Sequence, residues 1–181
     1  MSRFVVLLRG VNVGKGNKVP MADFRTALKG LGHGSVHTIL NSGNAVFTSS
    51  RRSSSSLAEG IATVVQDHFG VVTTVIVKSA AEFEAIVKNN PFPPPEPEHS
   101  RFLVVFTSNA SKLRELNSLS SLLLPGERFT VTEHAAYLHC AGGLLASKIG
   151  DEILSRTGRS ATTRNWATVL KLSTLLAESA A

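Results

Sequence analysis

The order of short apolar segments in the first eighty residues restricts the folds open to this chain. Four runs rich in β-branched residues predict strands, at residues 4–8, 36–40, 45–48 and 71–77. Two amphipathic segments predict helices, at residues 21–31 and 56–69, with Gly32 and Gly70 placed to end them. Ser56 and Glu59 have capping-box spacing at the start of the second helix. This βαββαβ order is typical of ferredoxin-like α/β sandwiches.

The second half of the chain repeats this order less regularly. A helix is predicted to about residue 88 after a capping box at Ser79 and Glu82, and residues 90–97 then carry five of the seven prolines. The elements expected beyond are strands at 102–107, 129–132 and 136–140, and helices at 111–121, 144–156 (closed by Gly158) and 164–177. The last helix replaces or follows a final strand.

We therefore expect an α+β chain of two ferredoxin-like (βαββαβ) α/β-sandwich halves, the second with an extra C-terminal helix. The predicted domains are residues 1–90, a proline-rich linker or strap at 91–100, and residues 101–181. Sequence identity between the halves is negligible, so the repeat is inferred from the order of elements alone.

The composition, with 43% hydrophobic and 18% charged residues, is that of a chain with a buried core. No apolar run reaches the ~20 residues of a membrane-spanning helix and no signal-peptide pattern is present, so no membrane partner is expected. The single cysteine, Cys140, excludes an internal disulfide and any multi-cysteine metal site. A reducing, cytoplasmic location fits this usage best.

The positive charge of the chain is concentrated at its start. Residues 1–52 contain eight Lys or Arg and one acidic residue, Asp23, within a chain whose net charge is +6. Such a concentration favours anionic partners, including nucleic acid, nucleotides and phosphorylated metabolites. A solvated basic face is the alternative.

The connection between the first strand and the first helix, residues 9–20, is long and polar, and we call it the basic loop. It holds three glycines, two asparagines and three cations, whereas such connections usually need about 2–6 residues. Its glycine spacing departs from the Walker P-loop, and Gly16 stands where that motif has Ser or Thr, so no Walker-type NTPase is indicated. Glycine-rich backbone at a helix start can still bind an anion, with Lys15 and Lys18 adding charge. A mobile basic loop is an equal alternative.

Two further polar stretches are candidates for a site. Residues 41–44, Asn-Ser-Gly-Asn, could orient a ligand, although such a sequence is more often a hairpin turn. Thr163 is the predicted N-cap of the last helix, which places Arg164 where a cation is unfavourable and suggests a nearby anion. Trp166 begins the apolar face of that helix and is expected in the core rather than at a stacking surface.

The spacing of the remaining polar residues does not support a metal site or a catalytic triad. The six histidines form no helical ligand pair, so no metal or cofactor is expected. No nucleophile, histidine and acid can be assembled into a triad. Ser147-Lys148 could be a nucleophile pair, but Lys148 with Glu152 is also an ordinary helical ion pair.

Three stretches together resemble one known family. They are Leu8-Arg9-Gly10-Val11-Asn12-Val13-Gly14 continuing to Asn17-Lys18-Val19-Pro20-Met21, then Asn41-Ser42-Gly43-Asn44-Ala45-Val46-Phe47, and finally Thr162-Thr163-Arg164-Asn165-Trp166 with Val169, Lys171 and Leu172. The chain is similar over essentially its whole length to the domain of unknown function 1697 family. Asn90-Pro91-Phe92 and Ser147-Lys148 resemble its smaller landmarks, while Val11 and Asn41 replace the Ile and Gln that the family often has. The resemblance implies a duplicated ferredoxin-like fold and motif positions, but no reaction.

Because these hallmarks are polar loop residues, we expect them to bind rather than to pack. The predicted ligand-binding residues are Arg9, Asn12, Lys15, Lys18, Asn41, Ser42, Asn44, Lys148, Arg164 and Asn165. The hypothesis is one basic pocket for a phosphate-bearing anionic ligand, nucleic acid or nucleotide. The alternatives are an enzyme for a small phosphorylated or carboxylated substrate, with Lys148 or Arg164 as electrophilic helpers, and a structural or interaction module without a ligand.

Overall fold

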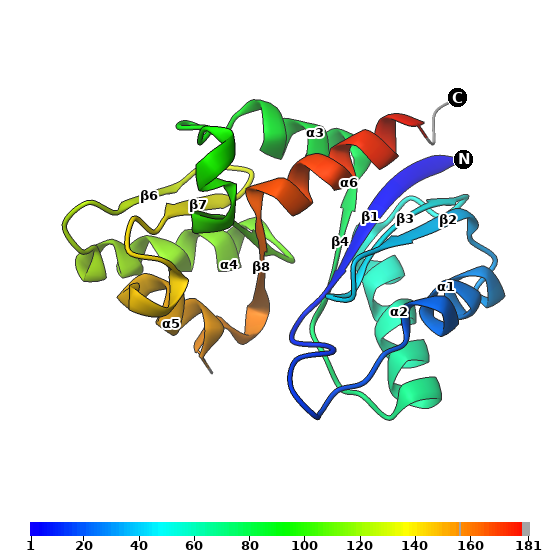
Figure 1. The fold of residues 1–181 in the computed structure, drawn as a ribbon. Coiled ribbons are helices and arrows are strands. Elements are labelled where there is room, and N and C mark those ends of the chain that lie inside the picture. Colours follow the sequence, from blue (N-terminus) through cyan, green and yellow to red (C-terminus); the bar gives the residue numbers. More distant parts are fainter. Residues whose placement is uncertain (156, 179–181) are drawn as a thin grey trace. The chain divides into compact units, whose positions relative to one another are not determined.

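Figure 1 shows the computed structural model, which describes residues 1–155 and 157–178 of the chain. It is a mixed α+β structure with two four-stranded antiparallel sheets. Unit 1 comprises Met1–Glu84 and the end of the chain from Leu172, and unit 2 comprises Ala85–Lys171. The domain limits expected from sequence, 1–90, 91–100 and 101–181, stay a prediction.

Unit 1 contains one of the two sheets, in the order β2-β3-β1-β4. Its elements are β1 (Ser2–Leu8), α1 (Met21–Gly30), β2 (Gly34–Ile39), β3 (Asn44–Ser49), α2 (Ser54–Phe69) and β4 (Val75–Ser79). The predicted βαββαβ order is present. Strand β1 is central, pairing antiparallel with both β3 and β4, which fixes the point where the basic loop leaves the sheet.

The core of unit 1 lies between this sheet and helices α1 and α2, which cover one of its faces (Figure 1). Alternate residues of β1, Phe4, Val6 and Leu8, point into this core, as the period of two along a strand requires. Phe24 of α1 and Ile61 of α2 meet them and are fully buried. The helices therefore dock through the apolar stripes that their sequences predicted.

Among the boundaries in unit 1 that differ from the prediction, two have a clear local cause. Helix α2 starts at Ser54 because Ser53, not Ser56, caps it: the Ser53 hydroxyl accepts from the Ser56 amide at 3.3 Å. Strand β4 starts at Val75 because Val75 is the partner of Leu8, the last residue of β1. The predicted box at Ser79 is confirmed, since the Glu82 carboxylate accepts from the Ser79 amide at 2.8 Å.

Unit 2 carries the second sheet, in the equivalent order β6-β7-β5-β8. After the 3-10 helix η1 (Glu96–Arg101), its elements are β5 (Phe102–Thr107), α4 (Ala110–Glu115), β6 (Arg128–Val131), β7 (Ala136–His139), α5 (Lys148–Leu154) and β8 (Ala161–Asn165). Helices α3 (Ala80–Lys88) and α6 (Trp166–Glu178) each contain residues of both units. A complete βαββαβ series is thus present before the last helix, which follows the final strand rather than replacing it.

Two helices predicted in unit 2 are each divided in the structure. Beyond Glu115 the predicted helix continues as a 3-10 helix, η2 (Leu116–Leu122). The segment predicted as one helix from 144 divides into η3 (Leu144–Ala146) and α5, because Ser147 is extended and caps α5 by accepting from the Gly150 amide. The predicted end of that helix at residue 156 lies outside the described residues.

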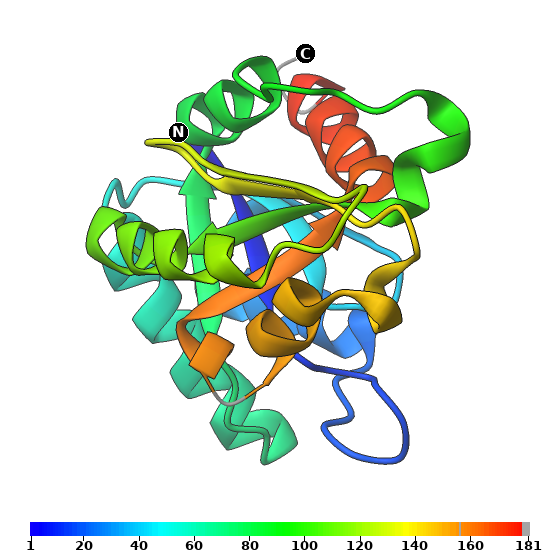
Figure 2. The same ribbon diagram turned by 90° about the vertical axis from the view of Figure 1, so that its left-hand side faces the viewer.

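Helices α4 and α5 cover one face of the second sheet (Figure 2). Leu113 of α4 and Ile149 of α5 pack there against Leu103 and Val105 of β5. On the opposite face the Tyr137 hydroxyl donates to the Ile86 carbonyl at 2.7 Å, and burial raises the pKa of Tyr137 to about 12. No helix among the described residues has the length and apolar character needed to cross a membrane.

Candidate functional site

The side chain of Asn12 makes three of the hydrogen bonds that hold the basic loop in shape. Its amide nitrogen donates to the Val19 carbonyl at 2.8 Å and to the Asn41 carbonyl at 2.7 Å, while its oxygen accepts from the Val19 amide at 2.8 Å. The Asn12 backbone is left-handed, with φ of 57°, a conformation that asparagine tolerates better than most residues. The two ends of the loop are thereby joined, and Asn12 has both amide hydrogens engaged.

The 41–44 turn packs directly against the basic loop, as expected for connections at one end of a sheet. The Leu8 amide donates to the Gly43 carbonyl at 2.8 Å. A Cβ on Gly43 would lie 2.6 Å from Leu8 Cβ and 2.7 Å from Val11 Cγ2, and Gly43 has φ of 78°. Only glycine fits between these neighbours. The structure therefore brings the first two motifs together.

Within that turn, Asn44 is a buried structural group. It is fully buried, and its amide donates to the Ile39 carbonyl at 3.2 Å and to the Ser42 hydroxyl at 2.9 Å. These bonds close the turn between β2 and β3. Ser42 and Asn41 are exposed, so they remain accessible to a ligand at this end of unit 1.

The three cations of the basic loop differ in environment. Arg9 is half-buried, and its backbone is fixed by a bond from its amide to the Thr74 carbonyl at 3.0 Å. Lys15 and Lys18 are exposed, and the Lys18 ammonium donates to the Gly14 carbonyl at 3.2 Å. An ammonium has three donors, so Lys18 can hold the loop and still meet an anion.

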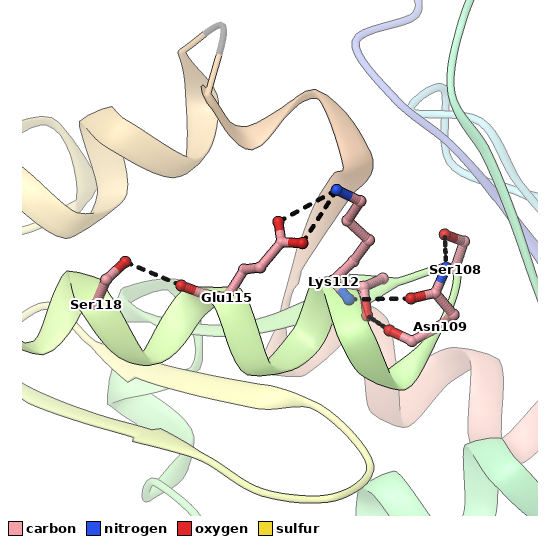
Figure 3. Close-up of polar contacts among 6 residues, drawn as sticks. Ser108, Asn109, Lys112, Glu115 and Ser118 are labelled. Carbon is pink, nitrogen blue, oxygen red and sulfur yellow. Dashed lines mark hydrogen bonds and ion pairs between the residues drawn. The ribbon is translucent and has the colours of Figure 1, made fainter.

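Helix α1 begins where the basic loop ends, and no side chain caps it. Pro20 occupies the N-cap position and makes no side-chain cap hydrogen bond. The equivalent helix of unit 2, α4, follows β5 after only two residues, and Figure 3 shows Asn109 accepting from the Lys112 amide at 2.9 Å. The first-turn amides of α1 therefore lack the side-chain acceptor that α4 has.

A groove of 590 Å³ runs between α1 and α2 from this helix start, and we call it the helix groove. Its lining residues are Pro20, Asp23, Thr26, Ala27, Gly30, Leu31, Val64, His68 and Phe69. The volume falls within the range of about 300–1,000 Å³ typical of small-molecule sites. None of the ten predicted residues lines it, so the basic loop borders the groove at Pro20 rather than forming its walls.

Sequence reasoning missed the helix groove because its residues follow ordinary helix patterns. Asp23, Ala27 and Gly30 are spaced three and four residues apart on α1, as Val64 and His68 are on α2. Such spacing predicts a face that packs against the sheet. The one feature of the sequence that could have indicated the groove is the small size of Ala27 and Gly30, since small residues on adjacent turns leave space between two helices.

In unit 2, the prediction that Arg164 opens the last helix is wrong. Arg164 lies in β8 opposite Val104 of β5, because the chain stays paired with β5 until Asn165. Arg164 is 7% exposed, and its guanidinium donates to the Thr162 hydroxyl at 2.9 Å and to the Thr163 carbonyl at 2.8 Å. Burial lowers the pKa of Arg164 to about 10, so it stays protonated at neutral pH.

The other two predicted residues of unit 2 lie at helix starts. Asn165, not Thr163, accepts from the Thr168 amide at 2.9 Å in the first turn of α6. Lys148 is exposed at the first position of α5. The two motifs of unit 1 meet each other, whereas their meeting with Lys148, Arg164 and Asn165 stays a prediction.

The chain thus has the fold of an α+β protein with two similar antiparallel sheets, and the long basic loop follows the first strand of unit 1. The family model described as a protein of unknown function (DUF1697) matches residues 1–137, and the chain belongs to this family. Among solved structures, the conserved bacterial protein SP0830 from Streptococcus pneumoniae is similar, with 27% sequence identity and a TM-score of 0.79. The match covers 97% of this chain and 98% of that one. Among curated proteins no match was found.

Proposed function

We propose that the chain binds a phosphate-bearing ligand, a nucleotide or a nucleic-acid end, in unit 1. The observation that carries this proposal is the contrast between two strand-to-helix connections. Two residues and an asparagine cap suffice between β5 and α4, whereas twelve residues, three of them cations, precede an α1 without a side-chain cap. If both units are ferredoxin-like, as we infer from their shared strand order, the fold itself does not require the longer loop.

The proposed pose uses the loop and the groove together. Phosphate oxygens meet Lys15, Lys18 and the first-turn amides of α1, where the positive end of the helix dipole favours an anion. The base or another apolar body lies in the helix groove against Phe69, which is half-buried, and the Asp23 carboxylate accepts from ribose hydroxyls.

This pose gives Asn12 and Asn44 a supporting role. Their amide groups are used in holding the basic loop and the 41–44 turn, so they shape the site instead of contacting the ligand. Asn41 and Ser42 are exposed at its edge, and Arg9 is half-buried at the start of the basic loop. A structural module without a ligand would need the same asparagines and the bond from Lys18 to the Gly14 carbonyl, but it would not need Lys15.

Calorimetric titration of the full chain with adenosine and guanosine 5′-phosphates tests the proposal. The double variant Lys15→Gln/Lys18→Gln should bind about tenfold or more weakly, because two charge-assisted contacts are removed. Arg51→Gln/Arg52→Gln makes the same charge change at exposed residues outside the loop and should bind as the parent does. Equal weakening in both variants would mean a diffuse basic surface, and no binding by the parent would refute the proposal.

Two further measurements separate the alternatives. A single-stranded oligonucleotide should show log K falling with log salt, with a slope of about −0.7 per phosphate contacted, if nucleic acid is the ligand. A flat response with retained mononucleotide binding favours a small ligand. Incubation of bound nucleotides with the chain, followed by product analysis, tests the enzyme alternative.

A further inference from the structure

Unit 2 contains a second cluster of charged and aromatic side chains, separate from the basic loop. A pocket of 160 Å³ lies between the proline-rich segment and one edge of the second sheet, and we call it the proline pocket. Its polar residues are Glu98, Arg128 and His139, and its apolar walls are Phe92, Phe102 and Pro93–Pro95. None of these residues was predicted as part of a site.

The sheet register places three of these side chains in a row. His139 of β7 is paired directly with Arg128 of β6 on one side and with Phe102 of β5 on the other. Directly opposite residues in antiparallel strands project to the same face with Cβ atoms about 4.5–5.5 Å apart. The cation, the imidazole and the aromatic ring are therefore held together by the backbone.

The proline-rich segment adds two contacts to this row. Glu98 Oε2 contacts Nε2 of His139, and the Arg128 guanidinium carbon lies 4.1 Å from the centre of the Phe92 ring. Phe92 in turn meets Phe102 edge-on, with ring centres 5.5 Å apart. The pocket is thus built by two separated stretches of sequence whose side chains fix one another.

The contact with Glu98 determines what His139 can offer. An ionised carboxylate only accepts hydrogen bonds, so the Nε2 of a neutral His139 carries the proton and its Nδ1 carries a lone pair. This arrangement resembles the carboxylate-oriented imidazole of acid–base sites. Within residues 1–155 and 157–178, Nδ1 of His139 makes no hydrogen bond, and His139 keeps 19% of its side chain exposed.

Arg128 provides the complementary charge. In the described part of the chain its guanidinium has no hydrogen-bond or ion-pair partner, although its face rests on Phe92. A guanidinium stacked by its face keeps the N–H donors at its edge for a planar, bidentate acceptor such as a carboxylate. Glu98 is engaged by His139, so it does not neutralise Arg128 directly.

We propose that the proline pocket binds a small hydroxy acid of three or four carbons. The carboxylate pairs with Arg128, the hydroxyl donates to Nδ1 of His139, and the short carbon chain lies against Phe92. The volume of 160 Å³, about five water molecules at ~30 Å³ each, suits a ligand of this size. The proposal is independent of nucleotide binding in unit 1.

Titration of the full chain with lactate, followed through the imidazole 15N and 1H signals of the histidines, tests the assignment. Lactate should shift the His139 signals and saturate, and propionate, which lacks only the hydroxyl, should bind about two- to tenfold more weakly. Inorganic phosphate is the control for nonspecific binding of an anion. Equal affinity for lactate and propionate, or a response to phosphate alone, would overturn the proposal.

Variants assign the two contacts. Arg128→Gln should weaken lactate about tenfold or more, whereas Arg114→Gln, which removes an exposed cation outside the pocket, should leave it unchanged. His139→Phe should abolish the preference for lactate over propionate while retaining carboxylate binding. Should Arg128→Gln fail to fold by circular dichroism, Arg128→Lys keeps the charge without the bidentate geometry and should weaken lactate less. Parent-like affinity in the folded Arg128 variant would refute the site.

Discussion

The two units reach their first helix by different routes from equivalent central strands. In unit 2, β5 passes to α4 through Ser108 and Asn109, and the Asn109 side chain caps the helix (Figure 3). In unit 1, the twelve residues of the basic loop separate β1 from α1. Both strands lie third in sheets of the same order, so the sheets do not account for the difference.

The comparison shows that the longer connection of unit 1 needs internal hydrogen bonds of its own to stay ordered. The basic loop needs three side-chain bonds from Asn12 and the close approach of Gly43 to hold its shape. A connection that only had to reverse the chain would not need this support. We infer that the loop is kept ordered so that its exposed lysines stay near the start of α1.

The largest effect is expected where the loop and the turn touch. Gly43→Ala places a Cβ 2.6 Å from Leu8 Cβ on a backbone with φ of 78°. Overpacking and left-handed strain together should lower the free energy of unfolding by about 2–4 kcal/mol. Urea unfolding followed by far-UV circular dichroism measures the change.

Gly14→Ala is the matched control for this prediction. Gly14 has φ of 62°, but no atom lies within 4 Å of an added Cβ, so only the strain of about 1–2 kcal/mol applies. Trp166 is the only tryptophan and belongs to unit 2, so its fluorescence follows that unit during unfolding. Equal losses for the two glycine variants would show that the close approach at Gly43 is unimportant.

Asparagine-to-alanine changes in the two connections should differ in cost. Asn12→Ala removes three hydrogen bonds and leaves the Val19 amide and two carbonyls without partners, which should cost about 2–3 kcal/mol. Asn109→Ala removes one helix cap and should cost about 1 kcal/mol. Chemical denaturation of both variants checks the ranking. A larger loss of stability in the Asn109 variant would contradict the role of Asn12 in holding the basic loop.

Sequence reasoning located most elements of the fold because strand and helix periods are local properties. Strand β8 was missed because Thr162, Thr163 and Arg164 are polar, and only their pairing with β5 makes them a strand. The placement of Arg164 at the start of the last helix was wrong for the same reason, since helix-dipole arguments depend on where the helix begins. Register and burial across the sheet are long-range, so a local pattern does not contain them.

Part of the candidate site could likewise be predicted from the sequence, and part could not. Polar residues in a long loop marked the basic loop and the 41–44 turn, and their contact follows from connections at one end of a sheet. The helix groove and the proline pocket depend on side chains from distant segments, such as Asp23 with His68 and Glu98 with His139. Each of these residues alone has an ordinary explanation, so composition and spacing could not pair them.

A cap can be added to α1 to test whether its free amides matter. Pro20→Asp gives the helix a side-chain acceptor, and Pro20→Ala loses the proline without providing one. The aspartate variant should be more stable than the alanine variant by about 1 kcal/mol. It should also bind nucleotide about tenfold more weakly, because its carboxylate occupies the amides and repels phosphate. Equal affinities in calorimetry would remove the helix start from the proposed site.

The smallest effect concerns the histidines, which the two units use differently. His33 of unit 1 is buried against Phe47, with ring centres 4.7 Å apart, whereas His139 of unit 2 is partly exposed beside Glu98. Burial, and secondarily the charge of Arg51, lowers the pKa of His33 from its ordinary value of 6.5. Below pH 6.5 the unfolded chain therefore binds a proton that the folded chain still excludes, so stability falls as the pH falls through that window.

His33→Phe should keep the ring packing and flatten this part of the stability profile, while His37→Gln, at an exposed position of β2, should leave the slope as in the parent. An unchanged slope in His33→Phe would assign the acid sensitivity to other groups.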